Sequence, residues 1–410
     1  MTGDVPPARL VAAHEAAVEF YRTRLLASPG PAGYLAQRGL EMLARPDLPW
    51  RPGIDLPWRL GYAPPGWTTL LDHLHRSRFT GAELEAAGLA TRTRAGRLID
   101  RFRDRIMFPV RAPDGHPIGF LGRIWRPDTE PDTPKYLNSP DTTIYHKGQT
   151  LFGMAEQADR LAGGAPPVLV EGPLDAIAVW LAHPPSAGLP RVALASCGTA
   201  FTPEHTAILC ALPGARQHGV TVAYDADPAG IKATDRAWDL LADRRDIATF
   251  AASLPDGADP ADLIGHPDRI AALRAGLSYR ARPLGDTVVD HLLERLIARY
   301  PKVLVELEGR IALARAAAKL LARMPADDVA NRLVPYLAEV TDLGLDTVLG
   351  AVLGELEEPT GPASTPRGAR GPRAPTGTAA AFPTLRPGHH RGGDRPALPD
   401  TPRPPRGPHR

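Results

Sequence analysis

Cysteine is nearly absent from this chain of 410 residues, which contains only Cys197 and Cys210. A structural zinc ribbon needs about four cysteine or histidine ligands in paired spacing, so we expect no internal zinc site. So little cysteine also indicates a reducing compartment, because stable disulfides form mainly in oxidising ones. We interpret both cysteines as small buried side chains.

Long apolar runs are missing as well. No segment approaches the roughly 20 consecutive apolar residues of a membrane-spanning helix. Residues 1–7 lack the basic start and apolar core of a signal peptide. We therefore predict a cytoplasmic protein with no membrane partner.

A strong overall charge is also missing, because 48 basic residues nearly balance 46 acidic ones and leave a net charge of +2. Such a balance does not by itself imply a nucleic-acid partner, so the distribution of charge matters more than its sum. The hydrophobic content of 43% supports real cores, and the length suits two or three domains.

Two short apolar runs each end at acidic residues. Residues 168–170 precede Glu171 and Gly172, and residues 220–223 precede Asp225 and Asp227. Helical patterns follow at 174–182 and 231–242, and further strands are expected at 191–196 and 247–251. Strand, acidic turn and helix, repeated, is typical of a doubly wound α/β unit, in which ligands lie at the carboxyl ends of the strands.

The acidic residues at these strand ends point to a metal site. Asp225 and Asp227 are two residues apart, so an extended strand end would direct both to one face, and Glu171 joins them if its strand is a neighbour. At about 4 Å, unpaired carboxylates repel by roughly 4 kcal/mol, which a counter-ion would relieve. Oxygen ligands favour Mg²⁺ or Mn²⁺, which suit phosphoryl or nucleotidyl transfer. Either motif alone would more often be a simple turn. The two motifs together, each after a predicted buried strand, favour a metal site over a turn.

The remaining segments predict an α+β region before this unit and helices after it. A helix is expected at 11–27, a glycine-terminated helix turn at 34–40 and a rigid turn at 60–67. Strands at 106–110 and 118–124 would form a hairpin around Asp114-Gly115. Alternate arginines at 101, 103 and 105 would share a strand face, either as a basic groove or as an ordinary solvated surface. Amphipathic helices are expected at 288–300 and 311–324.

Several ordered motifs carry a family resemblance. The segments 171–175 and 225–230 resemble the TOPRIM fold of primases, topoisomerases and some nucleases. The flanking motifs at 104–110, 135–140, 146–148 and 254–260 resemble the catalytic core of DnaG-type bacterial primases. The resemblance runs in order from about residue 15 to 280, and more weakly to 355.

The resemblance implies an α/β fold, in which a TOPRIM doubly wound parallel sheet follows an α+β primase-core subdomain and precedes a small helical subdomain. The expected boundaries are 1–160 for the first part with its basic groove, 165–280 for TOPRIM and 281–355 for the helices. Residues 356–410 are rich in proline, arginine and glycine and are expected to be disordered, because they cannot bury enough apolar surface.

By resemblance, the activity is synthesis of short RNA primers on single-stranded DNA. The residues expected to hold the catalytic Mg²⁺ or Mn²⁺ are Glu171, Asp225 and Asp227, and those expected to support a second ion are Asp175, Asp256 and Asp259. The residues expected to position the template and incoming ribonucleoside triphosphate are Arg38, Arg123, Lys135, Asn138 and Lys147. For Asp175, stabilisation of a helix dipole is a competing interpretation.

The sequence departs from the family at both ends. From the resemblance, we expect no zinc-binding domain before residue 11, and we expect the proline-rich tail in place of the usual helicase-binding domain. A replicative helicase and a separate zinc-binding protein are therefore candidate partners. Two other functions stay open. One is a TOPRIM nuclease, against which the primase-like flanks and the lack of a P-loop argue. The other is a non-catalytic protein that binds single-stranded DNA.

Overall fold

The computed structural model describes residues 5–44, 57–126, 133–184 and 188–357, apart from the side chains of Asp256 and Glu357. All of them lie within one compact unit, Met1–Pro359. The segment predicted to be a disordered tail, from residue 358 onward, lies outside the described residues.

The N-terminal part is built on a four-stranded antiparallel sheet in the order β1-β4-β5-β6. Its strands are β1 (Gly61–Ala63), β4 (Arg105–Arg111), β5 (Pro117–Ile124) and β6 (Tyr136–Asn138). The β4–β5 hairpin confirms the prediction at Asp114-Gly115, where Gly115 has a φ of +89°. The predicted rigid turn at 60–67 is wrong in part, because β1 pairs with β4 there.

Helices surround this sheet, and a small hairpin lies beside it. The helices are α1 (Pro7–Leu26), α2 (Pro29–Gln37), α3 (Glu41–Ala44), α4 (Thr69–Arg76) and α5 (Gly81–Ala86). The hairpin consists of β2 (Ala90–Arg92) and β3 (Leu98–Asp100). The apolar side of α1 packs with α4, α5 and the sheet in one core that includes Tyr21, Phe102 and Phe120. The helix predicted at 11–27 and the glycine stop after 37 are confirmed, with Gly39 at a φ of +70°.

The second part is a five-stranded sheet in the order β11-β10-β9-β7-β8. Four strands are parallel: β7 (Pro167–Val170), β8 (Val192–Ala195), β9 (Val220–Ala223) and β10 (Thr249–Ala251). The short edge strand β11 (Arg282–Pro283) is antiparallel. Because β7 lies next to β9, with Val170 opposite Ala223, the two acidic segments leave the sheet at the same edge. The predicted doubly wound sheet is confirmed.

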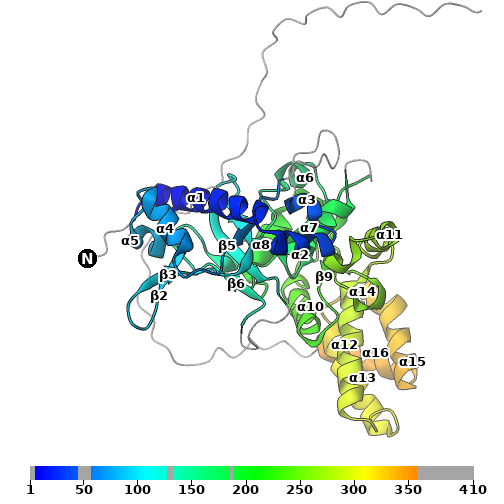
Figure 1. The fold of residues 1–410 in the computed structure, drawn as a ribbon. Helices are drawn as coiled ribbons and strands as arrows, with labels where there is room; N and C mark the ends of the chain where they lie inside the picture. The colour runs from blue at the N-terminus through cyan, green and yellow to red at the C-terminus, as the bar shows by residue number, and fades with distance from the viewer. Residues whose placement is uncertain (1–4, 45–56, 127–132, 185–187, 358–410) are drawn as a thin grey trace, which may run out of the picture. The chain divides into compact units, whose positions relative to one another are not determined.

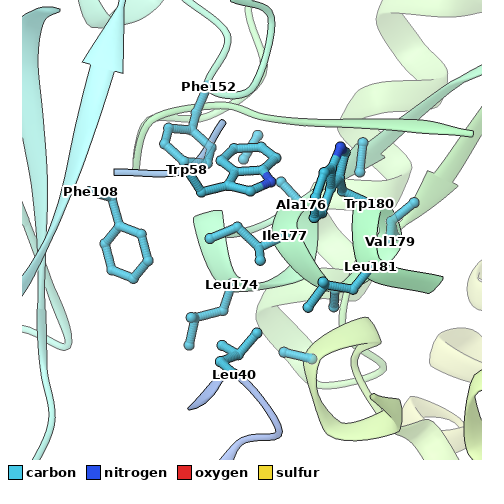
Figure 2. Packing of buried hydrophobic residues seen from close by; sticks show 14 of the residues in the cluster. Leu40, Trp58, Phe108, Phe152, Leu174, Ala176, Ile177, Val179, Trp180 and Leu181 are labelled. Atoms are coloured by element: carbon cyan, nitrogen blue, oxygen red, sulfur yellow. The ribbon is translucent and has the colours of Figure 1, made fainter. Parts of the chain in front are cut away.

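Helix α7 (Pro173–Ala182) packs in one hydrophobic core with residues of both sheets. All ten of its residues are buried. Figure 2 shows Leu174, Ile177 and Trp180 of this helix among Trp58, Phe108 and Phe152, which come from the N-terminal part and the connection after it. The Trp58 and Phe152 rings stack with centroids 5.4 Å apart. The start of α7, directly after Glu171, is therefore fixed by packing on several sides.

Other helices complete the second part, and a helical group follows it (Figure 1). The first set comprises α6 (Ala158–Ala162), α8 (Pro203–Ala211), α9 (Pro213–His218), α10 (Pro228–Leu241) and α11 (Pro267–Gly276). The helical group comprises α12 (Leu284–Arg299), α13 (Leu307–Leu321), α14 (Ala326–Asp328), a π-helical turn (Val329–Leu333), α15 (Val334–Thr341) and α16 (Leu345–Glu357). Its apolar faces share a core with α10 and β9, which confirms the predicted amphipathic helices.

Two predictions were based on what the sequence contains little of, namely cysteine and long apolar runs. Cys197 and Cys210 are both buried and free, as expected. Among the described residues, no helix is both long and apolar enough to cross a membrane.

Candidate metal and nucleotide site

The acidic site lies where β7 and β9 end. Glu171 follows the last residue of β7 directly. The prediction that Asp225 and Asp227 share a strand face is wrong in its local geometry, because β9 ends at Ala223 and both aspartates lie in the loop before α10. Asp227 instead caps α10, and its Oδ1 accepts hydrogen bonds of 2.8 Å from the backbone N–H groups of Ala229 and Gly230.

The entry from this loop into α10 is so tight that Gly230, in the first turn of the helix, is obligatory. A Cβ atom on Gly230 would lie 2.0 Å from the carbonyl oxygen of Asp225. Asp225 is therefore held against the first turn of α10, while Asp227 keeps one oxygen, Oδ2, outside the capping bonds. This arrangement explains why the Asp-Pro-Ala-Gly sequence follows the strand so closely.

The carboxylates at this edge repel one another. Burial, followed by the charges of Asp225 and Asp227, raises the pKa of Glu171 to about 7. Burial, followed by the charge of Asp259, raises the pKa of Asp225. Lys135 acts in the opposite direction on both groups. A shared rise of this kind marks negative charge that the protein itself does not neutralise.

Asp175 and Asp259 extend this charge, but their carboxylates also have structural partners. Asp175 is 7% exposed, and its two oxygens accept hydrogen bonds from the N–H groups of Gly172 (3.1 Å) and Ala261 (3.2 Å). Asp259 accepts one of 2.7 Å from the N–H of Asp262. Burial and neighbouring carboxylates raise the pKa of both. The side chain of Asp256 lies outside the described residues.

The donor chemistry suits a divalent ion, although the side chains do not already enclose one. Within the described part of the chain, no three histidine, cysteine or acidic side chains meet as a ready-made metal site. The residues that share the raised pKa values offer only carboxylate oxygens, which are the ligands that Mg²⁺ and Mn²⁺ prefer. An ion would also relieve the repulsion that those pKa values record.

Three of the predicted substrate-binding residues lie in or near β6: Lys135 directly precedes this strand, Asn138 is its last residue, and Lys147 follows it in the chain. Lys135 is exposed and close enough to lower the pKa of Glu171, Asp225 and Asp259. Asn138 lies against the loop after β8, with its Nδ2 3.5 Å from the Gly198 carbonyl and its buried Oδ1 without a hydrogen-bond partner among the described residues. The side chain of Lys147 is exposed.

The two predicted arginines are engaged within the protein. The Nη1 atom of Arg38 lies 3.0 Å from Oδ1 of Asp262, so this ion pair joins α2 to the acidic loop. Arg123 is only 7% exposed, and its guanidinium donates hydrogen bonds to the hydroxyl oxygens of Tyr34 (2.9 Å) and Tyr136 (2.5 Å). The structure therefore places Arg123 behind two tyrosines rather than in an open groove.

The arginines at 101, 103 and 105 correct a further prediction, since they do not share a face of one strand. Only Arg105 belongs to β4, and its Nη1 donates to the carbonyls of Gly122 and Pro134, both at 3.0 Å. Arg101 donates to the Asn138 carbonyl, and Arg103 donates to the Asp100 carbonyl. These side chains hold backbone segments together, which sequence alternation could not reveal.

Sequence reasoning missed Tyr136 and the reason for Gly172. A Cβ atom on Gly172 would lie 3.0 Å from the Tyr136 hydroxyl oxygen and 3.2 Å from Oδ2 of Asp175. Gly172 thus lets the β6 tyrosine approach the first turn of α7, beside Glu171. The available signal was the Glu-Gly pair after a buried strand, but its partner lies about 35 residues earlier in the chain.

Comparisons with known proteins agree with this geometry. A family described as "DNA primase catalytic core, N-terminal domain" matches residues 50–158, and a "Toprim-like" family matches residues 168–264. A DNA primase of Pseudomonas aeruginosa is 34% identical over 358 residues, which cover 85% of this chain and 48% of that protein. The chain thus spans about half the length of this relative.

Solved structures match over nearly their whole length. The RNA polymerase domain of Mycobacterium tuberculosis primase DnaG has a TM-score of 0.62 and 32% identity, covering 82% of this chain and 99% of that one. A DnaG primase catalytic domain bound to single-stranded DNA has a TM-score of 0.59 and 29% identity, covering 83% and 98%. On the sheet topology, the acidic edge and these matches, the chain belongs to the DnaG primase family and corresponds to its catalytic core.

Proposed function

We propose that this protein is a primase that synthesises short RNA primers on single-stranded DNA by metal-dependent nucleotidyl transfer. The observation that carries the proposal is the group of mutually repelling carboxylates at the β7–β9 edge, with Lys135 close to them, in a chain of the DnaG family. The solved relative with bound single-stranded DNA supports the choice of template.

Each side chain in the site has a proposed task. Glu171, Asp225 and Asp227 would hold one Mg²⁺ or Mn²⁺ ion, and Asp175 and Asp259, with Asp256, would support a second. The ion, when bound, supplies positive charge that favours ionisation of the attacking 3′ hydroxyl and offsets the charge of the triphosphate. Since Asp175 and Asp259 already accept backbone hydrogen bonds, their proposed share in ion binding is the smaller one.

The cationic and amide groups would position the substrates. Lys135 and Lys147 carry compact charges suited to phosphate oxygens, and Asn138 would contribute through the loop after β8, whose Gly198 carbonyl lies 3.5 Å from its Nδ2. Arg38 would contribute from the edge of α2, where it is partly exposed. Arg123 would act on substrate mainly through the two tyrosines whose hydroxyl groups it holds. We further propose that ribonucleoside triphosphates are the substrates, that a replicative helicase is a partner, and that the protein works in the cytoplasm.

A primer-synthesis assay tests this function. Wild-type protein is incubated with single-stranded DNA, Mg²⁺ or Mn²⁺ and labelled ribonucleotides, with Asp225→Asn as the matched variant. We expect extension products from the wild type, none from Asp225→Asn, and DNA binding by both, because the variant loses one ion-binding charge and no DNA-binding group. Shortened DNA in place of extended products would instead identify a nuclease. DNA binding with no turnover would identify a non-catalytic binder.

A further inference from the structure

The turn that carries Lys147 is held by the first turn of helix α8. Lys147 begins a short 3₁₀ helix, Lys147–Gln149, and three carbonyl oxygens of this turn accept hydrogen bonds from α8 and its cap. Nε2 of His205 lies 3.0 Å from the Lys147 carbonyl oxygen and 3.1 Å from that of Thr150. Oγ1 of Thr202 donates to the Gly148 carbonyl at 2.7 Å. The turn and α8 are therefore joined by three hydrogen bonds.

His205 is suited to this contact and to no other. Its side chain is 0% exposed and stacks on the Phe201 ring, with centroids 5.9 Å apart. Both neighbours of Nε2 are carbonyl oxygens, so Nε2 must carry the hydrogen, and Nδ1 has no partner among the described residues. A polar ring enclosed in this way has one hydrogen-bond donor, and the Lys147 turn receives it.

Thr202 links the same contact to the start of the helix. Its hydroxyl oxygen caps α8 by accepting from the N–H of His205 at 3.0 Å, while its hydroxyl hydrogen goes to the turn. The remaining bonds of the turn are local and solvent-exposed, such as the one from the Lys147 N–H to Asp141 at 3.1 Å. The chain separation is 58 residues between Lys147 and His205, so sequence neighbours do not replace this support.

We propose that His205, together with Thr202, is a positioning residue that fixes the Lys147 turn so that the Lys147 ammonium group meets the substrate phosphates. A lysine has a flexible stem and a single point charge, so its placement depends on the backbone from which it projects. The inference rests on the proposed function, because it requires that Lys147 bind nucleotide. A purely structural histidine would affect stability without acting through Lys147.

Two substitutions separate the hydrogen bond from the volume of the ring. His205→Leu removes the donor and keeps an apolar side chain, whereas His205→Gln keeps an N–H donor at a similar reach. The matched control is His14→Leu, because His14 is equally buried, at 0% exposed, and its Nδ1 lies 2.8 Å from a carbonyl oxygen, that of Leu10, in a different core. Each variant is measured for thermal unfolding and for kcat and KM in primer synthesis.

We expect His205→Leu to raise the KM for ribonucleotide about tenfold, as the loss of about one buried hydrogen bond implies, with kcat changed less than about twofold. His205→Gln should restore most of the KM. His14→Leu should lower the unfolding temperature comparably and leave KM unchanged. If His205→Leu does not fold, Thr202→Gly takes its place, because glycine is a tolerated cap but has no hydroxyl donor.

A double-mutant cycle with Lys147→Met decides the mechanism. We expect Lys147→Met alone to raise KM, and His205→Leu to have no further effect on KM in that background, since residues that act through one another are not additive. The inference is overturned if His205→Leu leaves KM unchanged, if its effect persists after Lys147→Met, or if Lys147→Met itself has a normal KM. In all three cases an active wild type leaves the proposed function standing. A wild type that makes no primer refutes the function and the inference together.

Discussion

The acidic edge of the five-stranded sheet and the arginines of the four-stranded sheet are both dense groups of like charge, but their surroundings in the protein differ. Arg105 and Arg123 each donate hydrogen bonds to protein oxygens and are 5% and 7% exposed. Glu171 and Asp225, in contrast, are half-buried and remain close to further carboxylates, which raises the pKa of each. The arginines therefore have hydrogen-bond partners within the protein, whereas the charge of the carboxylates is not neutralised there.

The difference separates structural charge from functional charge. A guanidinium that bridges two backbone carbonyls stabilises the fold and has little capacity left for a ligand. Carboxylates that repel one another destabilise the fold slightly and persist where binding of a cation repays that cost. Lys135 belongs with the second group, because it is exposed and lowers the pKa of several site carboxylates.

The largest effect is expected from Glu171→Gln. Loss of an ion-binding carboxylate should lower primer synthesis by at least about 100-fold. Because Glu171 is half-buried and repelled, the same change should leave stability unchanged or raise it by about 1 kcal/mol at pH 8 without divalent ions. Initial rates and urea unfolding measure the two effects. A variant that is both active and less stable would place Glu171 with the structural charges.

The opposite pattern is expected from Arg105→Met. Its guanidinium bonds to the carbonyls of Gly122 and Pro134, and the methionine would remove both of these hydrogen bonds. We expect a loss of about 2–3 kcal/mol in the free energy of unfolding. Arg94→Met is the control, since Arg94 is exposed between β2 and β3, and its loss should cost less than about 0.5 kcal/mol. Equal losses of stability in the two variants would show that the buried Arg105 contributes no more to stability than the exposed Arg94.

A smaller effect on activity is expected from Lys135→Met. The KM for ribonucleotide should rise about tenfold with the loss of one charge-assisted contact. The pH profile of synthesis should shift to higher pH, because Lys135 no longer lowers the pKa of Glu171. Lys319→Met, an exposed change on α13, should alter neither quantity. An unchanged pH profile after Lys135→Met would separate this lysine from the carboxylates.

The smallest effect is expected from pH alone. The folded-state pKa of Glu171 is about 7, above its ordinary value of 4.5. A raised pKa favours the folded state below pH 4.5, and that contribution is lost as the pH rises through 7. The free energy of unfolding without metal should therefore fall over this interval, and the fall should be smaller with Mg²⁺ or in Glu171→Gln. Urea titrations at pH 4.5 and 8 measure this fall. An equal fall in the free energy of unfolding of Glu171→Gln would exclude Glu171 as its source.

Much of the site could be predicted because it depends on local pattern. Apolar runs that end at Glu171 and before Asp225 identified two buried strands, and parallel strands place their ends at one edge. The pairing of β7 with β9 confirmed that placement. The Asp114-Gly115 turn between two apolar runs was equally informative, because it predicted the β4–β5 hairpin.

What could not be predicted depends on partners distant in the chain. Arg123 meets Tyr34 across 89 positions, and Asp175 meets Ala261 across 86. No local pattern distinguishes such an arginine from one that faces solvent. Asp227 was placed wrongly for another reason, since its capping of α10 competes with extension of β9, and the short Asp-Pro-Ala-Gly turn favours the cap.

Direct titration with Mn²⁺ tests the central claim, that the carboxylates at the β7–β9 edge bind a divalent ion because the protein leaves their charge unneutralised. Calorimetry at pH 8 on the wild type and on Asp225→Asn would compare the two affinities in the absence of nucleotide and DNA. We predict binding to the wild type that weakens at least about tenfold in the variant, since one ligand charge is lost. Equal affinity of both proteins for Mn²⁺ would contradict the account.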